Sequence, residues 1–120
     1  MMKLDHLSLP VSDLARSKRW YVATPGLKVE FEIPDRRTVA LQDTEGFAIF
    51  LQEVPTPIAA RGCALWFQVP DVDAIHAEWS ARGVSFTHGP EKSFWGYGAE
   101  LADPDGYLIR LWDERTMKSK

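Results

Sequence analysis

The sequence predicts an α+β fold built from two copies of one βαβββ module. Residues 5–14 resemble residues 63–72, and residues 43–51 resemble residues 103–111, in the same order and at nearly the same interval. Similarity of this kind within one chain indicates an internal duplication. Within each half, short segments alternate apolar and polar side chains with the period of a β-strand. Turn-forming residues separate these segments from one another.

The first module is expected to span residues 1–53, with its first strand over residues 4–11. The helix that follows is predicted from Leu14 to Ala23, because Ser12 or Asp13 can cap its start. The breaker Thr24-Pro25-Gly26 ends it. Three further strands complete the module, over residues 27–33, 37–42 and 47–53.

The second module is expected to span residues 63–113, with a first strand over residues 63–69. Its helix is predicted from Val72 to Arg82, between an N-cap at Asp71 and a terminating Gly83. The turn at residues 103–106 indicates a hairpin. The remaining strands are expected over residues 84–88, 97–102 and 107–113.

The two modules are expected to form one domain over residues 1–120, joined by a linker over residues 54–62. A module of about 60 residues buries only about 60% of its surface, so it would be marginal alone. The modules must therefore share a core, either within one chain or between two chains of a dimer. The two prolines of the linker fix an extended hinge that would suit either arrangement, including an exchange of modules.

Composition excludes several classes of partner. The net charge is −3, and the basic residues form no stripe, which argues against nucleic acid. No apolar run approaches the length of about 20 residues that a membrane helix needs. The N-terminal residues lack the pattern of a secretion signal, and the single Cys63 fits a reducing compartment. We therefore expect a cytoplasmic protein.

Strand parity divides the side chains into two faces, of which one is uniformly apolar and should pack under the helices. The other face carries aromatic rings with a few dispersed polar groups, which is typical of a small-molecule cleft. An ordinary wet sheet surface is the alternative, although such a surface usually carries more charged residues. The residues predicted on the cleft face are His6, Ser8, Phe50, Gln52, Trp66, Gln68, Arg110 and Trp112, with Trp95 and Tyr97 on a loop beside it.

Three segments resemble the vicinal oxygen chelate superfamily, which includes glyoxalase I, bleomycin resistance proteins and extradiol dioxygenases. These segments are residues 4–14, Trp20-Tyr21 before Pro25-Gly26-Leu27, and the closing residues 103–111. The resemblance implies paired βαβββ modules that form a cupped, incompletely closed mixed barrel. It also implies a homodimer, in which the modules are often exchanged.

The same resemblance implies a position for each metal ligand on the first and last strand of each module. In this sequence these positions hold His6, Phe50, Ala64 and Arg110, so only His6 could bind a metal. Since known sites need three or four converging ligands, we predict no metal and no other cofactor. This pattern favours a binding protein over an enzyme.

The preferred hypothesis is a protein of the bleomycin-resistance type, with antibiotic resistance as one role, that binds or sequesters a small aromatic compound. His6, Ser8, Gln52 and Gln68 would orient the compound, and Arg110 would neutralise an anionic group if it has one. The sequence leaves open whether Arg110 faces the cleft or pairs with Glu100 or Asp113. The alternative is a metal-dependent lyase, isomerase or dioxygenase of the same superfamily. A module that assembles with another protein is a third hypothesis. The rings expected to stack on the ligand are Phe50, Trp66, Trp95, Tyr97 and Trp112.

Overall fold

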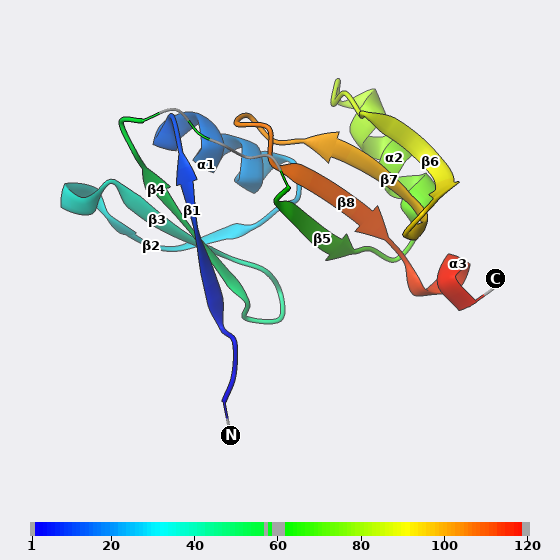
Figure 1. The fold of residues 1–120 in the computed structure, drawn as a ribbon, viewed down its shortest axis with the longest axis horizontal. Coiled ribbons are helices and arrows are strands. Elements are labelled where there is room, and N and C mark those ends of the chain that lie inside the picture. Colours follow the sequence, from blue (N-terminus) through cyan, green and yellow to red (C-terminus); the bar gives the residue numbers. More distant parts are fainter. Residues whose placement is uncertain (1, 57, 59–61, 119–120) are drawn as a thin grey trace. The chain divides into compact units, whose positions relative to one another are not determined.

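The computed structural model describes residues 2–56, 58 and 62–118, and the chain divides into two compact units, Met1–Ala59 and Ala60–Lys120. Each unit contains a four-stranded mixed sheet and a helix of ten residues (Figure 1). The two predicted βαβββ modules are therefore confirmed. Their union into one domain stays a prediction, and residues 57 and 59–61 of the predicted linker lie outside the described residues.

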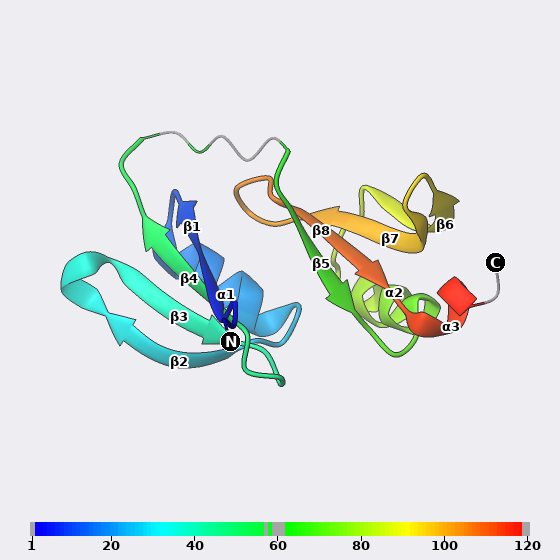
Figure 2. The ribbon, with the colours of Figure 1, turned by 60° about the horizontal axis from the view of Figure 1, so that its bottom comes forward.

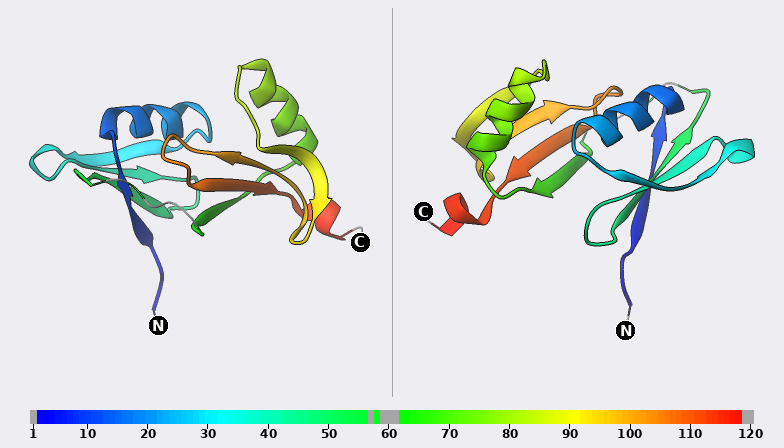
Figure 3. Two further views of the ribbon diagram at one scale, coloured as in Figure 1. Left: turned by 45° about the horizontal axis from the view of Figure 1, so that its top comes forward. Right: turned by 180° about the vertical axis from the view of Figure 1, so that it is seen from behind.

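In the first unit, the strands are arranged in the order β1-β4-β3-β2, with β1 parallel to β4 and the other pairs antiparallel. Helix α1 packs on one face of this sheet, against β3 and β4 (Figure 3). We call the covered side of a sheet its helix face and the other side its open face. The elements are β1 (His6–Val11), α1 (Leu14–Ala23), β2 (Lys28–Ile33), the short 3-10 helix η1 (Pro34–Arg36), β3 (Thr38–Gln42) and β4 (Ala48–Glu53).

The second unit repeats this arrangement in the order β5-β8-β7-β6, with β5 parallel to β8 (Figure 2). Helix α2 packs against β6 and β7, and a short C-terminal helix α3 contacts β7. Among the described residues, no helix combines the length and the apolar character needed to span a membrane. The elements are β5 (Ala64–Gln68), α2 (Val72–Ala81), β6 (His88–Ser93), β7 (Gly96–Ala102), β8 (Leu108–Trp112) and α3 (Glu114–Lys118).

Strand alternation sorts the side chains of both units largely as predicted. Most apolar residues of the helix faces are buried, and Trp79 of α2 is buried with them, whereas Phe47, Phe67 and Val69 are half-buried. Leu7 is an exception at 42% exposed, because it lies near the start of β1, an edge strand with a neighbour on one side only. The buried residues of the predicted apolar set are Leu9, Val11, Ile49, Leu51, Leu65, Tyr107, Ile109 and Leu111.

Both helices begin where the sequence predicts, because an aspartate caps each of them. The side chain of Asp13 accepts the N–H of Arg16 at 3.0 Å, and that of Asp71 accepts the N–H of Ala74 at 3.1 Å. These bonds satisfy N–H groups that the first turn of a helix leaves without an internal partner.

A second acid, at the end of the last strand of each unit, binds the same helix start. Glu53 accepts the N–H of Leu14 at 3.0 Å, and Asp113 accepts the N–H of Val72 at 2.7 Å. A carboxylate at a helix N-terminus is favoured because the helix dipole places partial positive charge there. The corresponding contact in both units is a detail that a duplication would preserve.

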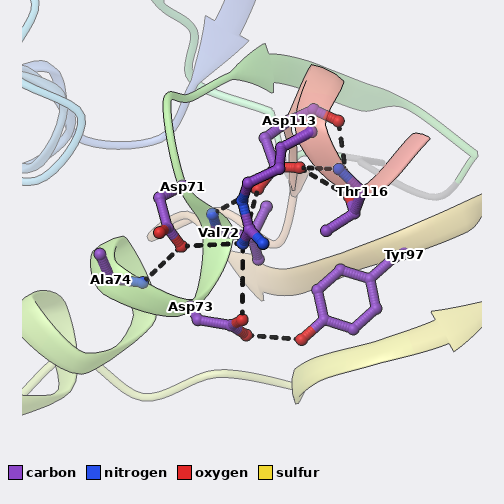
Figure 4. A network of polar contacts seen from close by, with 8 residues as sticks. Asp71, Val72, Asp73, Ala74, Tyr97, Asp113 and Thr116 are labelled. Atoms are coloured by element: carbon purple, nitrogen blue, oxygen red, sulfur yellow. Dashed lines mark hydrogen bonds and ion pairs between the residues drawn. The ribbon is translucent and has the colours of Figure 1, made fainter. Parts of the chain in front are cut away.

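Asp113 joins α2 and α3 to the end of β8 (Figure 4). Its side chain is fully buried, and its other carboxylate oxygen accepts the N–H of Thr116 at 2.8 Å and the hydroxyl of the same residue at 2.6 Å. Burial alone would raise the pKa of Asp113, but these hydrogen bonds and that from Val72 outweigh it and hold the pKa below its ordinary value of 3.8.

The prediction of a strand over residues 84–88 is wrong. The N–H of Val84 instead closes the end of α2 on the carbonyl of Trp79 at 3.0 Å, and strand β6 begins only at His88. This strand includes Pro90, which has no backbone N–H to donate within a sheet. An edge strand tolerates proline, and the register of β6 shifts between His88 and Glu91 to accommodate it.

We predict that Asp113→Asn lowers the free energy of unfolding by about 1–3 kcal/mol, because an amide cannot accept all the hydrogen bonds that the carboxylate accepts. The pKa of Asp113 is lower in the folded than in the unfolded chain, so the Asp113 carboxylate stabilises the fold fully at any pH above the pKa of the unfolded chain. This stabilisation is lost as the pH falls through the pKa of the folded chain. Urea unfolding at a series of pH values should therefore show that the difference in free energy of unfolding between wild type and Asp113→Asn becomes smaller below pH 3.8.

The matched control is Asp35→Asn, which changes an exposed aspartate of η1 and should leave stability within about 0.5 kcal/mol of wild type. Equal stability of the Asp113→Asn protein and wild type at neutral pH would contradict the role assigned to this buried carboxylate.

Candidate functional site

The open face of the first unit carries a small group of stacked rings. His6 of β1 stacks on Phe50 of β4 with ring centroids 4.4 Å apart, and Phe31 of β2 meets Phe50 edge-on at 5.5 Å. Ser8 and Gln52, also predicted here, are exposed on the same face. His6 Nδ1 lies 3.4 Å from a carboxylate oxygen of Asp5.

Phe31 was not among the predicted site residues, because simple alternation assigns it to the same face as Val29. The register of β2 shifts between these two residues, so that Val29 pairs with Leu41 whereas Phe31 pairs with Ala40. Ala40 lies opposite Phe50 on the open face. A bulge of this kind reverses the alternation of a strand, and a single sequence carries no clear signal for it.

The open face of the second unit carries a group that we call the Arg110 cluster: Trp66, Phe94, Trp95, Glu100 and Arg110. The guanidinium carbon of Arg110 lies 5.0 Å from the ring centroid of Trp66, 5.6 Å from that of Phe94 and 5.8 Å from that of Trp95. Trp66 and Trp95 meet edge-on with centroids 4.7 Å apart. Each ring is thus within the range of a cation–π contact with the same cation.

Arg110 also pairs with Glu100, which answers the question that the sequence left open. The two residues lie opposite each other on β8 and β7, and Arg110 Nε donates to Glu100 Oε2 at 3.0 Å. Both side chains are only 16% exposed. Thr87 donates its hydroxyl to the other carboxylate oxygen at 2.9 Å, so that both oxygens of Glu100 are held.

The protonation of Glu100 follows from these contacts. Burial by itself would raise the pKa of Glu100, but the hydrogen bonds from Arg110 and Thr87 and the nearby positive charge outweigh it and lower the pKa. Glu100 is therefore a carboxylate at neutral pH, and Arg110 and Thr87 fix its orientation.

Trp95 reaches the cluster because Gly98 leaves room for its ring. Phe94 and Trp95 form the turn between β6 and β7, and Gly98 lies on β7. A Cβ at Gly98 would overlap the ring of Trp95 and the carbonyl oxygen of Leu111. Gly98 is thus required for a close approach of an indole ring to the backbone.

Tyr97 does not join the rings that the sequence grouped with it. It alternates with Ala99, which pairs with Leu111 on the helix face, and its hydroxyl donates to Asp73 of α2 at 2.5 Å (Figure 4). This hydrogen bond raises the pKa of Tyr97 to about 12. The predicted loop position is wrong, because Tyr97 lies within β7 and its side chain shares the helix face with Ala99.

The other predicted residues of the second unit lie beside the cluster. Gln68 and Trp112 pair in the register of β5 and β8, on the open face next to Trp66 and Arg110. Gln68 donates to Glu114 of α3 at 3.2 Å, and Trp112 is half-buried. From the sequence, Glu100 is expected only as a possible partner of Arg110, and Phe94 and Thr87 are not among the predicted residues of the site.

Of the four positions at which the resemblance implies metal ligands, His6 alone carries a side chain that could bind a metal ion. Phe50 stacks on His6, Arg110 is bonded to Glu100, and Ala64 has no donor atom. Within residues 2–56, 58 and 62–118, no group of three or more His, Cys, Asp or Glu side chains could hold a metal. We therefore derive no reaction step through a metal.

We predict that Gly98→Ala displaces the Trp95 ring from the sheet and strains the pairing of β7 with β8, because the added methyl group would overlap both that ring and the carbonyl oxygen of Leu111. The variant should lose at least about 1 kcal/mol of stability and show a changed near-ultraviolet circular dichroism signal of tryptophan. The control is Gly89→Ala, where the nearest atom is Nε2 of the His76 ring at 3.3 Å and only that side chain must give way. Wild-type stability and spectrum for Gly98→Ala would disprove the packing described for Trp95.

Comparison with known proteins assigns the fold to a family. The chain is similar to the crystal structure of TnmS3, an antibiotic-binding protein from Streptomyces sp. CB03234, with 29% identity, a TM-score of 0.78 and coverage of 94% of this chain and 96% of that one. It is also similar in fold to a glyoxalase/bleomycin resistance protein/dioxygenase from Nocardioides, with 17% identity, a TM-score of 0.78 and coverage of 94% and 83%.

A shorter match relates the chain to a probable enoyl-CoA hydratase from Rhodobacter capsulatus, with 36% identity over 58 residues. This match covers 48% of the chain and 22% of that protein, so the match spans about a fifth of that relative's length. The profile of one family matches residues 3–111, nearly the whole chain. With this match and the two βαβββ modules, the chain belongs to the Glyoxalase/Bleomycin resistance protein/Dioxygenase superfamily.

Proposed function

We propose that the open face of the second unit binds a small aromatic compound, and that the protein holds or sequesters this compound without catalysis and without a metal. The proposal is based on the Arg110 cluster, in which a cation and three aromatic rings lie on one face of the sheet. A few oriented polar groups among aromatic rings are typical of sites for small molecules.

The exposure of Trp66 supports stacking as the mode of binding. This residue is 47% exposed although it lies in the middle of β5, and the edge-on contact with Trp95 fixes its ring. A fixed and exposed indole offers a flat apolar surface whose burial by a ligand ring is favourable. Trp112, on the same face, would extend this surface.

Arg110 supports the binding of a ligand with an anionic group. Among the described residues, its hydrogen bond is the one from Nε to Glu100, which leaves the two terminal nitrogens of the guanidinium for a ligand. A guanidinium held in place by a carboxylate can donate two parallel hydrogen bonds to a planar anion. Gln68 would add a polar contact at the edge of the rings.

The comparisons support binding in general and leave the ligand open. TnmS3, to which this chain is 29% identical, is described as an antibiotic-binding protein. The substitutions at the family's ligand positions, above all Arg110, argue for the same class of function here. By itself, the open face of the first unit would offer a separate stacking surface, with Phe50 and His6 as rings and Ser8 and Gln52 as hydrogen-bonding groups.

We predict that Trp66→Leu weakens the binding of 2-naphthoate, a flat two-ring carboxylate, by about three- to tenfold, because the stacking surface is lost. Isothermal titration calorimetry of wild type and variant measures this change. The control is Trp20→Leu, since Trp20 lies on helix α1 and should not affect binding. No heat of binding with wild type for any of several aromatic acids would overturn the proposal, as would equal affinities for wild type and Trp66→Leu.

We further propose a homodimer, with or without exchanged modules. Each unit is small for a stable core of its own, and Leu4 and Leu7 of the first unit are 73% and 42% exposed. Light scattering after size-exclusion chromatography should give twice the mass of one chain. A mass of one chain at all concentrations tested would contradict this prediction.

A further inference from the structure

The surroundings of Arg110 have the chemistry of a site for an organic cation. Three aromatic rings lie within 5.8 Å of its guanidinium carbon, and the carboxylate of Glu100 lies 3.0 Å from its Nε. Aromatic rings attract a cation through the negative charge of their faces, and a carboxylate adds its full charge. The cation that fills this site is a side chain of the protein itself.

Without Arg110, other contacts would still hold Glu100, Trp66 and Trp95 in place, whereas Phe94 is 90% exposed. Thr87 binds Oε1 of Glu100 at 2.9 Å and thereby orients the carboxylate. Trp66 and Trp95 contact each other directly, and Gly98 provides the space for the Trp95 ring. Removing the guanidinium would therefore leave the Glu100 carboxylate and the Trp66 and Trp95 rings without the cation that they now contact.

The charged side chains near Arg110 support the interpretation of its surroundings as a cation site. His88 lies opposite Glu100 on β6, with its ring 6.4 Å from that of Trp95, and its Nδ1 is 3.4 Å from a carboxylate oxygen of Glu91. Arg110 is the cation bonded to Glu100, with its Nε 3.0 Å from Oε2. Its loss would leave the charge of Glu100 uncompensated beside the rings.

The first unit provides an internal comparison. The positions that correspond to Glu100 and Arg110 hold Ala40 and Phe50, which face each other in the register of β3 and β4. No charged pair stands there, and Phe50 stacks on His6 instead. The arrangement of a cation among rings is therefore particular to the second unit and is not required by the shared fold.

We propose that Arg110 is the residue that determines the charge of the ligand: it occupies a cation site of Trp66, Phe94, Trp95 and Glu100, and so excludes organic cations and admits planar anions. This inference rests on the proposed function, because it concerns the ligand class of the same face. Arg110→Met, which keeps an unbranched chain and removes the charge, would open the site to a flat organic cation.

The experiment compares two probes with rings of equal size, 2-naphthoate and N-methylquinolinium, by equilibrium dialysis at one pH and ionic strength. Wild type should bind the anion at least about tenfold more tightly than the cation, and Arg110→Met should reverse this preference by a similar factor. Arg110→Lys keeps the charge and should keep the preference of wild type.

The matched control is Arg82→Met, which removes an exposed arginine of the same unit that pairs with Glu78 at 3.7 Å. It should bind both probes as wild type does. Circular dichroism establishes that each variant is folded, and the wild-type preference tests the inference even if Arg110→Met does not fold.

The outcomes separate the two proposals. If wild type binds the cation as tightly as the anion, or if Arg110→Met keeps the preference for the anion, the role of Arg110 is wrong while the binding function stands. If neither probe binds to wild type or to Arg110→Met, the binding function itself fails. A reversal in Arg110→Met without any change in Arg82→Met supports the inference.

Discussion

The register of β8 between its two neighbours is the constraint on which the open face of the second unit depends. In this register Arg110 lies beside Trp66 on β5 and beside Glu100 on β7. A shift by one residue would turn Arg110 toward α2 and bring Ile109 or Leu111 to the open side, because successive side chains of a strand alternate. The full burial of Ile109 and Leu111 beneath the helix therefore also fixes the position of the charged residue between them.

The two units keep the same contacts on their helix faces and differ on their open faces. An N-cap aspartate and an acid from the last strand hold the start of each helix. An aspartate also organises the turn before each last strand: Asp43 accepts the N–H of Phe47, and Asp103 accepts that of Tyr107, both at 2.9 Å. These contacts maintain the fold. The open face is free of this requirement, and it is there that Phe50 and Arg110 occupy corresponding places.

The parts of this structure that follow from local rules could be predicted from the sequence. The helix Leu14–Ala23 and the assignment of Trp66 and Arg110 to the open face depend only on caps and on alternation. The wrong predictions concern features that depend on how one strand pairs with its neighbour. The bulge in β2 moves Phe31, the edge position of β6 tolerates Pro90, and the pairing of β7 with β8 places Tyr97 on the helix side. The pair of Glu100 with Arg110 likewise requires the register between β7 and β8, which no single strand specifies.

The proposed function places the ligand at the rings around Arg110. Nuclear magnetic resonance of the tryptophan indole N–H groups tests it most directly, because the chain has five tryptophans in distinct places. On titration with 2-naphthoate, the signals of Trp66 and Trp95 should shift most, and those of Trp20 and Trp79 on the helices should stay unchanged. Shifts confined to Trp20 and Trp79, or no shift in any of the five signals, would contradict the account.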